Sequence, residues 1–287
     1  MMGYVQLVLC ALLWALTYHA GKFAVGVMPP LSAILWRFTT AVVILVPWIA
    51  LREGWDWRGL RRNLWPLLVM GVLGVVCFNL AMFYGLQSTS AVNASLIMAF
   101  SPILTACGTV LLGGERLSLA RVTGLLLGVL GVALVVTRGS LQALWQVGVE
   151  RGDVLMLGGS LAWAIYGLVP RRFVHGLAPA QMGAASLVVT VLTLWVLCAI
   201  ASPVALQLPP RAALWPILFM GVLATAVAYV WWNVGVVRIG ASRAAGFLNL
   251  IPVFTMLSGL LLGVSISLAQ LLGAALVIGG VALAARQ

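Results

Sequence analysis

The stretch LWPLLVMGVLG at residues 64–74 returns almost unchanged as LWPILFMGVLA at residues 214–224. The likeness extends without a gap from Arg61–Gly113 over Arg211–Gly263 at a constant offset of 150, and 17 of these 53 positions are identical. Self-similarity of this extent indicates an internal duplication. Paired repeats in membrane proteins usually enclose a substrate site, so the repeat is also the strongest indication of function.

The composition is typical of a membrane protein. The chain is 63% hydrophobic and 7% charged, with a mean hydropathy of +1.16. Apolar runs of about 20 residues, long enough to cross a bilayer as helices, follow one another along the chain. We predict ten such helices, at residues 4–23, 32–51, 64–86, 90–112, 119–137, 152–173, 180–200, 212–236, 243–263 and 267–285. The longest connections fall near 52–63 and 138–151.

The duplicated unit contains five helices. Trp14 matches Trp163 at an offset of 149, which extends the likeness to the first and sixth helices. Because five is odd, the second copy enters the membrane upside down relative to the first. We therefore predict an all-α integral membrane protein whose ten transmembrane helices form two inverted five-helix repeats, residues 1–140 and 150–287, around a central cavity. This geometry favours transport by alternating access.

The distribution of basic residues predicts the orientation. The net charge is +11, and Lys and Arg are retained on the cytoplasmic side of membrane proteins. With the N-terminus inside, eleven of the 16 basic residues are cytoplasmic. The sequence predicts a multi-pass protein of a bacterial-type inner (plasma) membrane with both termini cytoplasmic. The expected partners are the bilayer and a small-molecule substrate, not nucleic acid. A monomer is sufficient for this kind of function.

Catalysis is not expected. The chain has two histidines and five acidic residues, and all five acids fall in loops or at span ends. No HExxH, GxSxG, Walker or GxGxxG pattern is present, and we predict neither a metal nor a cofactor. Because no ionisable residue lies near the middle of a predicted span, we expect a mostly uncharged pocket and movement of substrate down its gradient. Lys22 and Arg37 are interpreted as anchors flanking the outer mouth, with contact to a substrate carboxylate as the lesser alternative.

Aromatic and weakly polar side chains share helical faces inside the predicted spans. Such groups should face protein or a water-filled cavity, because burying Trp or Asn polar hydrogens in lipid is costly. Ordinary helix packing explains them as well as substrate contact does. The candidate substrate-binding residues are Trp14, Thr17, Tyr18, Asn79, Phe83, Ser95, Met98, Trp163, Tyr166, Tyr229, Trp232 and Asn233.

Two prolines and two glycine ridges suggest mechanical roles. Pro102 and Pro252 interrupt the fourth and ninth helices at equivalent places, and we interpret them as bending points of opposing gates; a static kink is the alternative. Gly124, Gly128 and Gly131 form a small-residue ridge on the fifth helix, and Gly273 and Gly280 mirror it in part on the tenth. We expect these helices to form a rigid support within the monomer rather than a dimer interface.

The chain resembles the drug/metabolite transporter superfamily and its EamA-type repeat. The resemblance rests on the two five-helix halves, on residues 91–102 and 241–252, and on the Leu-Leu-Gly that follows each of these segments. Glu115 matches the Leu-Gly-Glu pattern of the family, but the second half lacks this acid. Length and an aromatic, uncharged interior look most like the amino-acid exporter branch.

The resemblance implies a secondary transporter or facilitator that exports small neutral or zwitterionic metabolites, including aromatic amino acids. Export of organic cations or drugs through cation–π contacts is the alternative within the transporter class. A non-transporting membrane scaffold and an integral-membrane enzyme are the alternatives from other classes.

Overall fold

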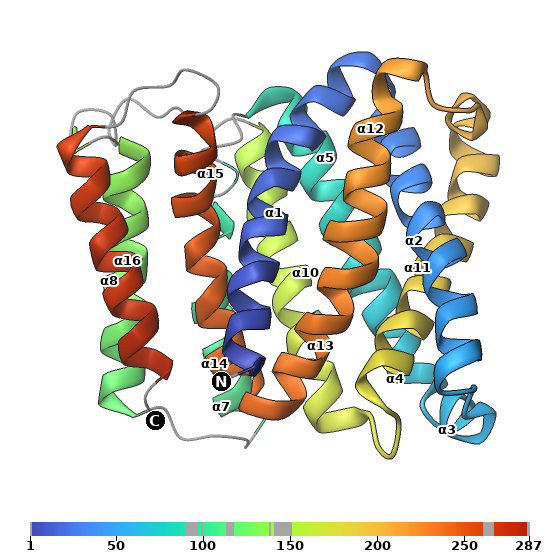
Figure 1. Ribbon diagram of the computed structural model, residues 1–287, viewed down its shortest axis with the longest axis horizontal. Coiled ribbons are helices and arrows are strands. Elements are labelled where there is room, and N and C mark those ends of the chain that lie inside the picture. The colour runs from blue at the N-terminus through green and yellow to red at the C-terminus, as the bar shows by residue number, and fades with distance from the viewer. Residues whose placement is uncertain are drawn as a thin grey trace.

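The computed structural model describes residues 2–89, 94, 97–98, 100–112, 118–137, 139–140, 151–260 and 267–285. The described residues form helices joined by short connections (Figure 1). Six of these helices are long and apolar enough to cross a membrane, namely 3–27, 30–52, 64–88, 151–170, 179–201 and 211–239. A helix satisfies its own backbone hydrogen bonds, which is what a chain this apolar requires in lipid.

The first half of the chain runs from α1 to α8. Its elements are α1 (Met2–Val27), α2 (Pro30–Arg52), α3 (Trp57–Arg62), α4 (Leu64–Val69), η1 (Met70–Cys77), α5 (Phe78–Ser88), α7 (Ser101–Leu111) and α8 (Leu119–Thr137). The predicted fourth span, 90–112, is described only in part, because residues 90–93, 95–96 and 99 lie outside the described residues.

The second half repeats this order. Its elements are α10 (Arg151–Phe173), α11 (Pro179–Ala201), η2 (Pro203–Leu206), α12 (Arg211–Gly221), η3 (Val222–Val227), α13 (Ala228–Ile239), α14 (Ala241–Gly246), η4 (Phe247–Asn249), α15 (Leu250–Leu260) and α16 (Leu268–Ala285). Both ends of the drawn chain lie at the same end of the bundle (Figure 1).

The two halves exchange contacts through their first helices. α1 packs against α12, α13 and α15 of the second half, whereas α10 packs against η1, α5 and α7 of the first. α2 and α11, which are also equivalent, pack against each other. The centre of the molecule is therefore built from both repeats, with α1 and α10 at its core.

The connection predicted near 52–63 contains a short helix, α3. α3 is capped by Asp56, whose Oδ1 accepts a hydrogen bond from the Gly59 backbone N–H at 2.9 Å. Gln181 of α11 ties the preceding turn down: its Oε1 accepts from the Asp56 N–H at 3.0 Å, and its Nε2 donates to the Gly54 carbonyl at 3.0 Å. The helix exists because a cap and a tertiary partner satisfy its backbone.

The sequence predicted one continuous helix for the third span and one for the eighth. The structure shows that neither is a uniform α-helix. Each contains a π-helical segment, η1 in the third and η3 in the eighth, and the offset of 150 carries 72–77 onto 222–227. A π-helix shifts the backbone ladder from i+4 to i+5 and occurs often at functional sites. The wider turn leaves a carbonyl for side-chain donors: the Trp14 indole Nε1–H donates to the Ala224 carbonyl at 2.9 Å.

α8 and α16 form a close antiparallel pair at one edge of the bundle (Figure 1). A Cβ on Gly131 would lie 2.5 Å from the Gly273 carbonyl oxygen, and a Cβ on Gly280 would lie 2.5 Å from the Gly124 carbonyl oxygen. The glycine ridges therefore face each other within one chain, as the support interpretation predicts. Because these are equivalent helices, their antiparallel packing means that the two halves run in opposite directions there.

The ninth span is interrupted at its proline. η4, a single 3₁₀ turn, separates α14 from α15, and Pro252 is the third residue of α15. In the first half α7 begins at Ser101, so Pro102 lies in its first turn. A proline fits the first helical turn because its missing N–H needs no partner there. Both prolines thus lie in the first turn of a helical segment, not in the middle of a continuous helix.

Candidate substrate cavity

Aromatic side chains from both halves meet at the centre of the bundle. Trp14 of α1 and Trp163 of α10 pack edge to face, with ring centroids 5.1 Å apart and planes at 84°. Trp232 lies 5.2 Å from Trp14 and 5.7 Å from Trp163, and Tyr229 lies 5.7 Å from Trp163. Edge-to-face pairs at this spacing stabilise the packing beyond the area that they bury. The cluster joins the first helix of each repeat to the eighth span.

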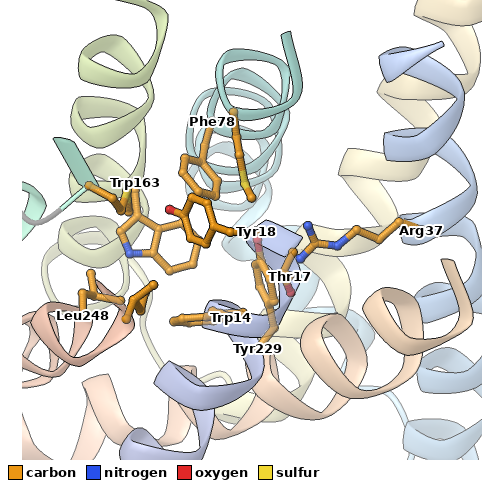
Figure 2. Close-up of a pocket in the computed structure, with 11 residues that line it drawn as sticks. Trp14, Thr17, Tyr18, Arg37, Phe78, Trp163, Tyr229 and Leu248 are labelled. Atoms are coloured by element: carbon orange, nitrogen blue, oxygen red, sulfur yellow. The ribbon is translucent and has the colours of Figure 1, made fainter. Parts of the chain in front are cut away.

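A cavity opens beside this cluster (Figure 2). The space available to the centre of a water-sized sphere is about 20 Å³, enough for about one water molecule. The lining residues come from seven of the ten predicted spans and are Trp14, Thr17, Tyr18, Arg37, Phe78, Met82, Met98, Trp163, Tyr229, Leu248 and Ile251.

Arg37 lies inside the bundle, and the prediction that it anchors the outer mouth was wrong. Its side chain is 2% exposed, and it lines the cavity. Its Nε–H donates to Thr225 Oγ1 at 2.8 Å, and its Nη1 donates to Asn79 Oδ1 at 3.2 Å. The expectation of an uncharged pocket was therefore also wrong, because the cavity has a guanidinium in its wall.

The tertiary structure explains why Arg37 does not reach outward. It is the eighth residue of α2, about 10 Å along the helix axis from Pro30. A basic side chain near a helix end can extend to the interface, but here η3 and α5 offer hydroxyl and amide acceptors inside the bundle. Gly221 lets η3 approach closely, since a Cβ there would lie 2.8 Å from the Arg37 carbonyl oxygen.

The position equivalent to Arg37 in the second half is Ser186, at the offset of 149 that relates Trp14 to Trp163. The packing agrees with this pairing, because a Cβ on Gly71 would lie 2.7 Å from the Ser186 carbonyl oxygen, as one on Gly221 meets that of Arg37. The backbones are thus equivalent while the side chains are not. The guanidinium breaks the chemical symmetry of the two repeats.

Six of the predicted binding residues line the cavity: Trp14, Thr17, Tyr18, Met98, Trp163 and Tyr229. The others lie beside or away from it. Asn79 holds Arg37, Tyr166 stacks on Trp163 with centroids 5.2 Å apart, and Asn233 donates from Nδ2 to the Tyr166 hydroxyl at 2.7 Å. Trp232 packs behind Trp14, and Phe83 is fully buried outside the lining. Ser95 lies outside the described residues.

Five lining residues were not among the sequence candidates: Arg37, Phe78, Met82, Leu248 and Ile251. The repeat could have identified one of them, because Leu248 is the partner of Met98 at the offset of 150. Phe78, Met82 and Ile251 carry no polar signal that separates them from ordinary core residues. Arg37 is an obvious charged residue in the sequence, but its position close to the start of the predicted span 32–51 favoured the anchor interpretation.

Two indole groups at the centre have no hydrogen-bond partner within the described part of the chain. These are Nε1 of Trp163 and Nε1 of Trp232, and both side chains are buried. An unsatisfied buried donor costs about 1–3 kcal/mol. Trp163 lines the cavity, so a molecule bound there could accept a hydrogen bond from its indole N–H.

Lys22, the other predicted anchor, stays exposed near the end of α1. Its Nζ donates to the backbone carbonyls of Leu86 and Thr89, at the end of α5. His19, one turn earlier, contacts the Thr255 carbonyl through Nε2 at 3.2 Å. Neither residue lines the cavity. The positive charge in the cavity wall thus comes from Arg37.

Apolar helices around a central cavity, built from two repeats that exchange contacts, define a multi-pass membrane transporter rather than an enzyme. The sequence profile of the EamA-like transporter family matches residues 1–137 and 150–286. The chain belongs to this family and contains two EamA repeats.

Two relatives match the chain over almost their whole length. An uncharacterized transporter, YyaM, of Bacillus subtilis is 34% identical over 279 residues, covering 97% of this chain and 92% of that protein. The aromatic amino acid exporter YddG of Ancylobacter novellus is 28% identical over 286 residues, covering 95% and 93%. A crystal structure superposes with a TM-score of 0.80 over 100% of this chain and 99% of the other, at 22% identity, and so supports the fold.

Proposed function

We propose that the protein exports small neutral or zwitterionic metabolites, amino acids including aromatic ones, by alternating access. The observation that carries this proposal is the central cavity, where an aromatic wall and a guanidinium face one space. A zwitterion with an apolar side chain complements this cavity, because its side chain can pack on the aromatic wall and its carboxylate can meet the guanidinium. The similarity to an aromatic amino acid exporter, at 28% identity, supports the same substrate class.

The two repeats, taken as 1–140 and 150–287, would cross the membrane in opposite orientations. The antiparallel packing of the equivalent helices α8 and α16 supports this inversion. Both chain ends lie at one end of the bundle, and the excess of basic residues makes the cytoplasm of a bacterial-type inner membrane the side of both. A site between inverted repeats can then open to either side in turn.

The cavity must enlarge for transport. Its open space of about 20 Å³ holds about one water molecule, far less than an amino acid requires. The arrangement therefore corresponds to a closed state of the pathway. The helix segments α7 and α15, which carry Pro102 and Pro252 in their first turns, give each half a place where the fourth and ninth spans can bend, and we propose these as the two gates.

The substrate's apolar side chain would lie against Trp14, Trp163 and Met98, with Tyr166 and Trp232 supporting the indoles from behind. Hydroxyl groups of Thr17, Tyr18 and Tyr229 supply polar contacts along the lining. Asn79 and Asn233 act through the side chains that they hold, Arg37 and Tyr166. Phe83 and Ser95 remain candidates from the sequence.

Export of organic cations is the runner-up, and the geometry counts against it. The indole rings would suit a cation, but Arg37 places a permanent positive charge in the same small space. A non-transporting scaffold would have no use for a buried charge held by side chains of two other spans.

The direct test is transport by proteoliposomes containing the purified protein. Labelled amino acids of several classes are loaded, and Trp14, Trp163 and Trp232 are changed to Ala one at a time. We expect transport of at least one apolar or aromatic amino acid, slowed severalfold or more in the Trp14 and Trp163 variants. Normal transport by all three variants would remove these residues from the site. Transport of no amino acid by the wild type would refute the proposed substrate class.

A further inference from the structure

Arg37 has binding capacity that the protein does not use. A guanidinium carries five N–H donors, and the hydrogen bonds to Thr225 and Asn79 occupy two of them. With Nε committed to Thr225, the free donors lie at the outer end of the fork, on Nη1 and Nη2. Figure 2 shows the side chain entering from one side of the cavity, opposite Trp163 and Leu248.

The positive charge also has no anionic partner among the residues that the structure describes. Three carboxylates are described, those of Glu53, Asp56 and Asp153, and none forms an ion pair with Arg37. An arginine remains charged in proteins, and a charge inside a membrane protein is costly unless it is paired. The cavity wall therefore holds a buried cation that two neutral groups satisfy only in part.

We propose that Arg37 binds the carboxylate of the transported substrate and makes this carboxylate a requirement for recognition. The free end of the fork matches the two oxygens of a carboxylate. The Asn79 bond, at 3.2 Å against 2.8 Å for Thr225, is the weaker of the two and the one that an incoming carboxylate would displace from Nη1. The substrates are then carboxylic acids with an apolar or aromatic body, with or without an ammonium group.

This assignment rests on the proposed function and narrows it. The substrate's body would lie toward Trp163 and Leu248, on the side of the cavity away from the guanidinium. Ser186, the equivalent residue of the second half, cannot supply this charge. A bound substrate would thus have one orientation within an otherwise repeated framework.

The test compares each acid with the amide in which a neutral carboxamide replaces the carboxylate. Binding to the purified protein in detergent is measured by calorimetry for L-phenylalanine and L-phenylalaninamide, L-leucine and L-leucinamide, and 3-phenylpropionate and 3-phenylpropanamide. We expect the wild type to bind the acid of at least one pair at least about tenfold more tightly than the amide, since a hydrogen bond to a charged group discriminates to this degree. Arg37→Gln should abolish the difference, and Arg37→Lys, which keeps the charge without the fork, should retain part of it.

The matched control is Arg211→Gln, which removes the same charge at an exposed position at the start of α12 and should leave the preference unchanged. If Arg37→Gln does not fold, the acid–amide preference of the wild type decides alone. Equal binding of acid and amide by a wild type that transports amino acids would overturn the role of Arg37 and leave the proposed function intact. Binding and transport of none of these acids would overturn both.

Discussion

Trp14 and Trp163 occupy equivalent places in the two repeats and meet edge to face at 5.1 Å, yet only Trp14 has a partner for its indole N–H. Trp14 donates to the Ala224 carbonyl within η3, whereas Nε1 of Trp163 has no acceptor among the described residues. The repeat that places both rings in one cluster therefore gives them different chemistry. One indole supports the fold, and the other offers a free donor beside the cavity.

This difference predicts opposite effects of the same substitution. Trp14→Phe should lower the free energy of unfolding by about 1–2 kcal/mol, because it leaves the Ala224 carbonyl without a donor. Trp163→Phe should leave it unchanged or raise it, because it removes a donor that has no partner, while ligand binding weakens. Denaturant unfolding in mixed micelles measures the first quantity. Equal losses of stability in both variants would contradict the assignment.

Two neighbouring glycines of α16 provide a test of the α8–α16 contact. Gly280→Ala should destabilise the protein by about 1–3 kcal/mol, because the new Cβ would lie 2.5 Å from the Gly124 carbonyl oxygen. Gly279→Ala is the control, since its Cβ would meet nothing within 4 Å and alanine favours the helix. Thermal unfolding in detergent compares the two. A Gly280→Ala protein as stable as Gly279→Ala would show that the helices are not packed this closely.

The gating proposal predicts a transport defect without a binding defect. Pro102→Ala and Pro252→Ala restore a backbone N–H where α7 and α15 begin, which favours a continuous helix over a hinge. Transport rates in proteoliposomes should fall severalfold, whereas substrate affinity should change little. Pro47→Ala, at an exposed position within α2, controls for the loss of a proline. Unchanged transport in both gate variants would make the two breaks static features of packing.

The cavity predicts transport without proton coupling. No His, Asp or Glu is among its lining residues, so no group there changes charge near neutral pH. An imposed proton gradient should therefore leave the final distribution of substrate across proteoliposomes unchanged. If it concentrates substrate, a carboxylate elsewhere must take part. The buried Asp153, which accepts from the Thr89 hydroxyl at 2.6 Å, is then the first to replace, by Asn.

Hydrophobic run length predicted four of the ten spans to within a few residues, because the thickness of the bilayer sets the length of a membrane-spanning helix. α1, α2, α10 and α11 each contain a predicted span and exceed it by a few residues. Run length and internal repetition can both be recognised in the sequence alone, without knowing which helices pack against each other. The π-helical segments of the third and eighth spans could not be predicted in this way, because they depend on a choice between i+4 and i+5 hydrogen bonds that neighbouring helices decide.

The candidate site shows the same division. Trp14, Trp163 and Tyr229 were found from helical faces, because an aromatic group with a polar hydrogen avoids lipid. Phe78, Met82 and Ile251 escaped notice, since nothing in an apolar side chain says whether it meets a cavity or a neighbour.

The sequence by itself determined that the chain crosses a membrane many times and that its two halves share one design, because hydropathy and repetition are properties of residue order. Only the tertiary structure decided where Arg37 lies. Thr225 and Asn79 follow it in the chain by 188 and 42 residues, and no local pattern shows that their oxygen atoms would meet its guanidinium. A charge stays inside a membrane protein only where folding supplies partners, and the two partners of Arg37 come from two other helical spans.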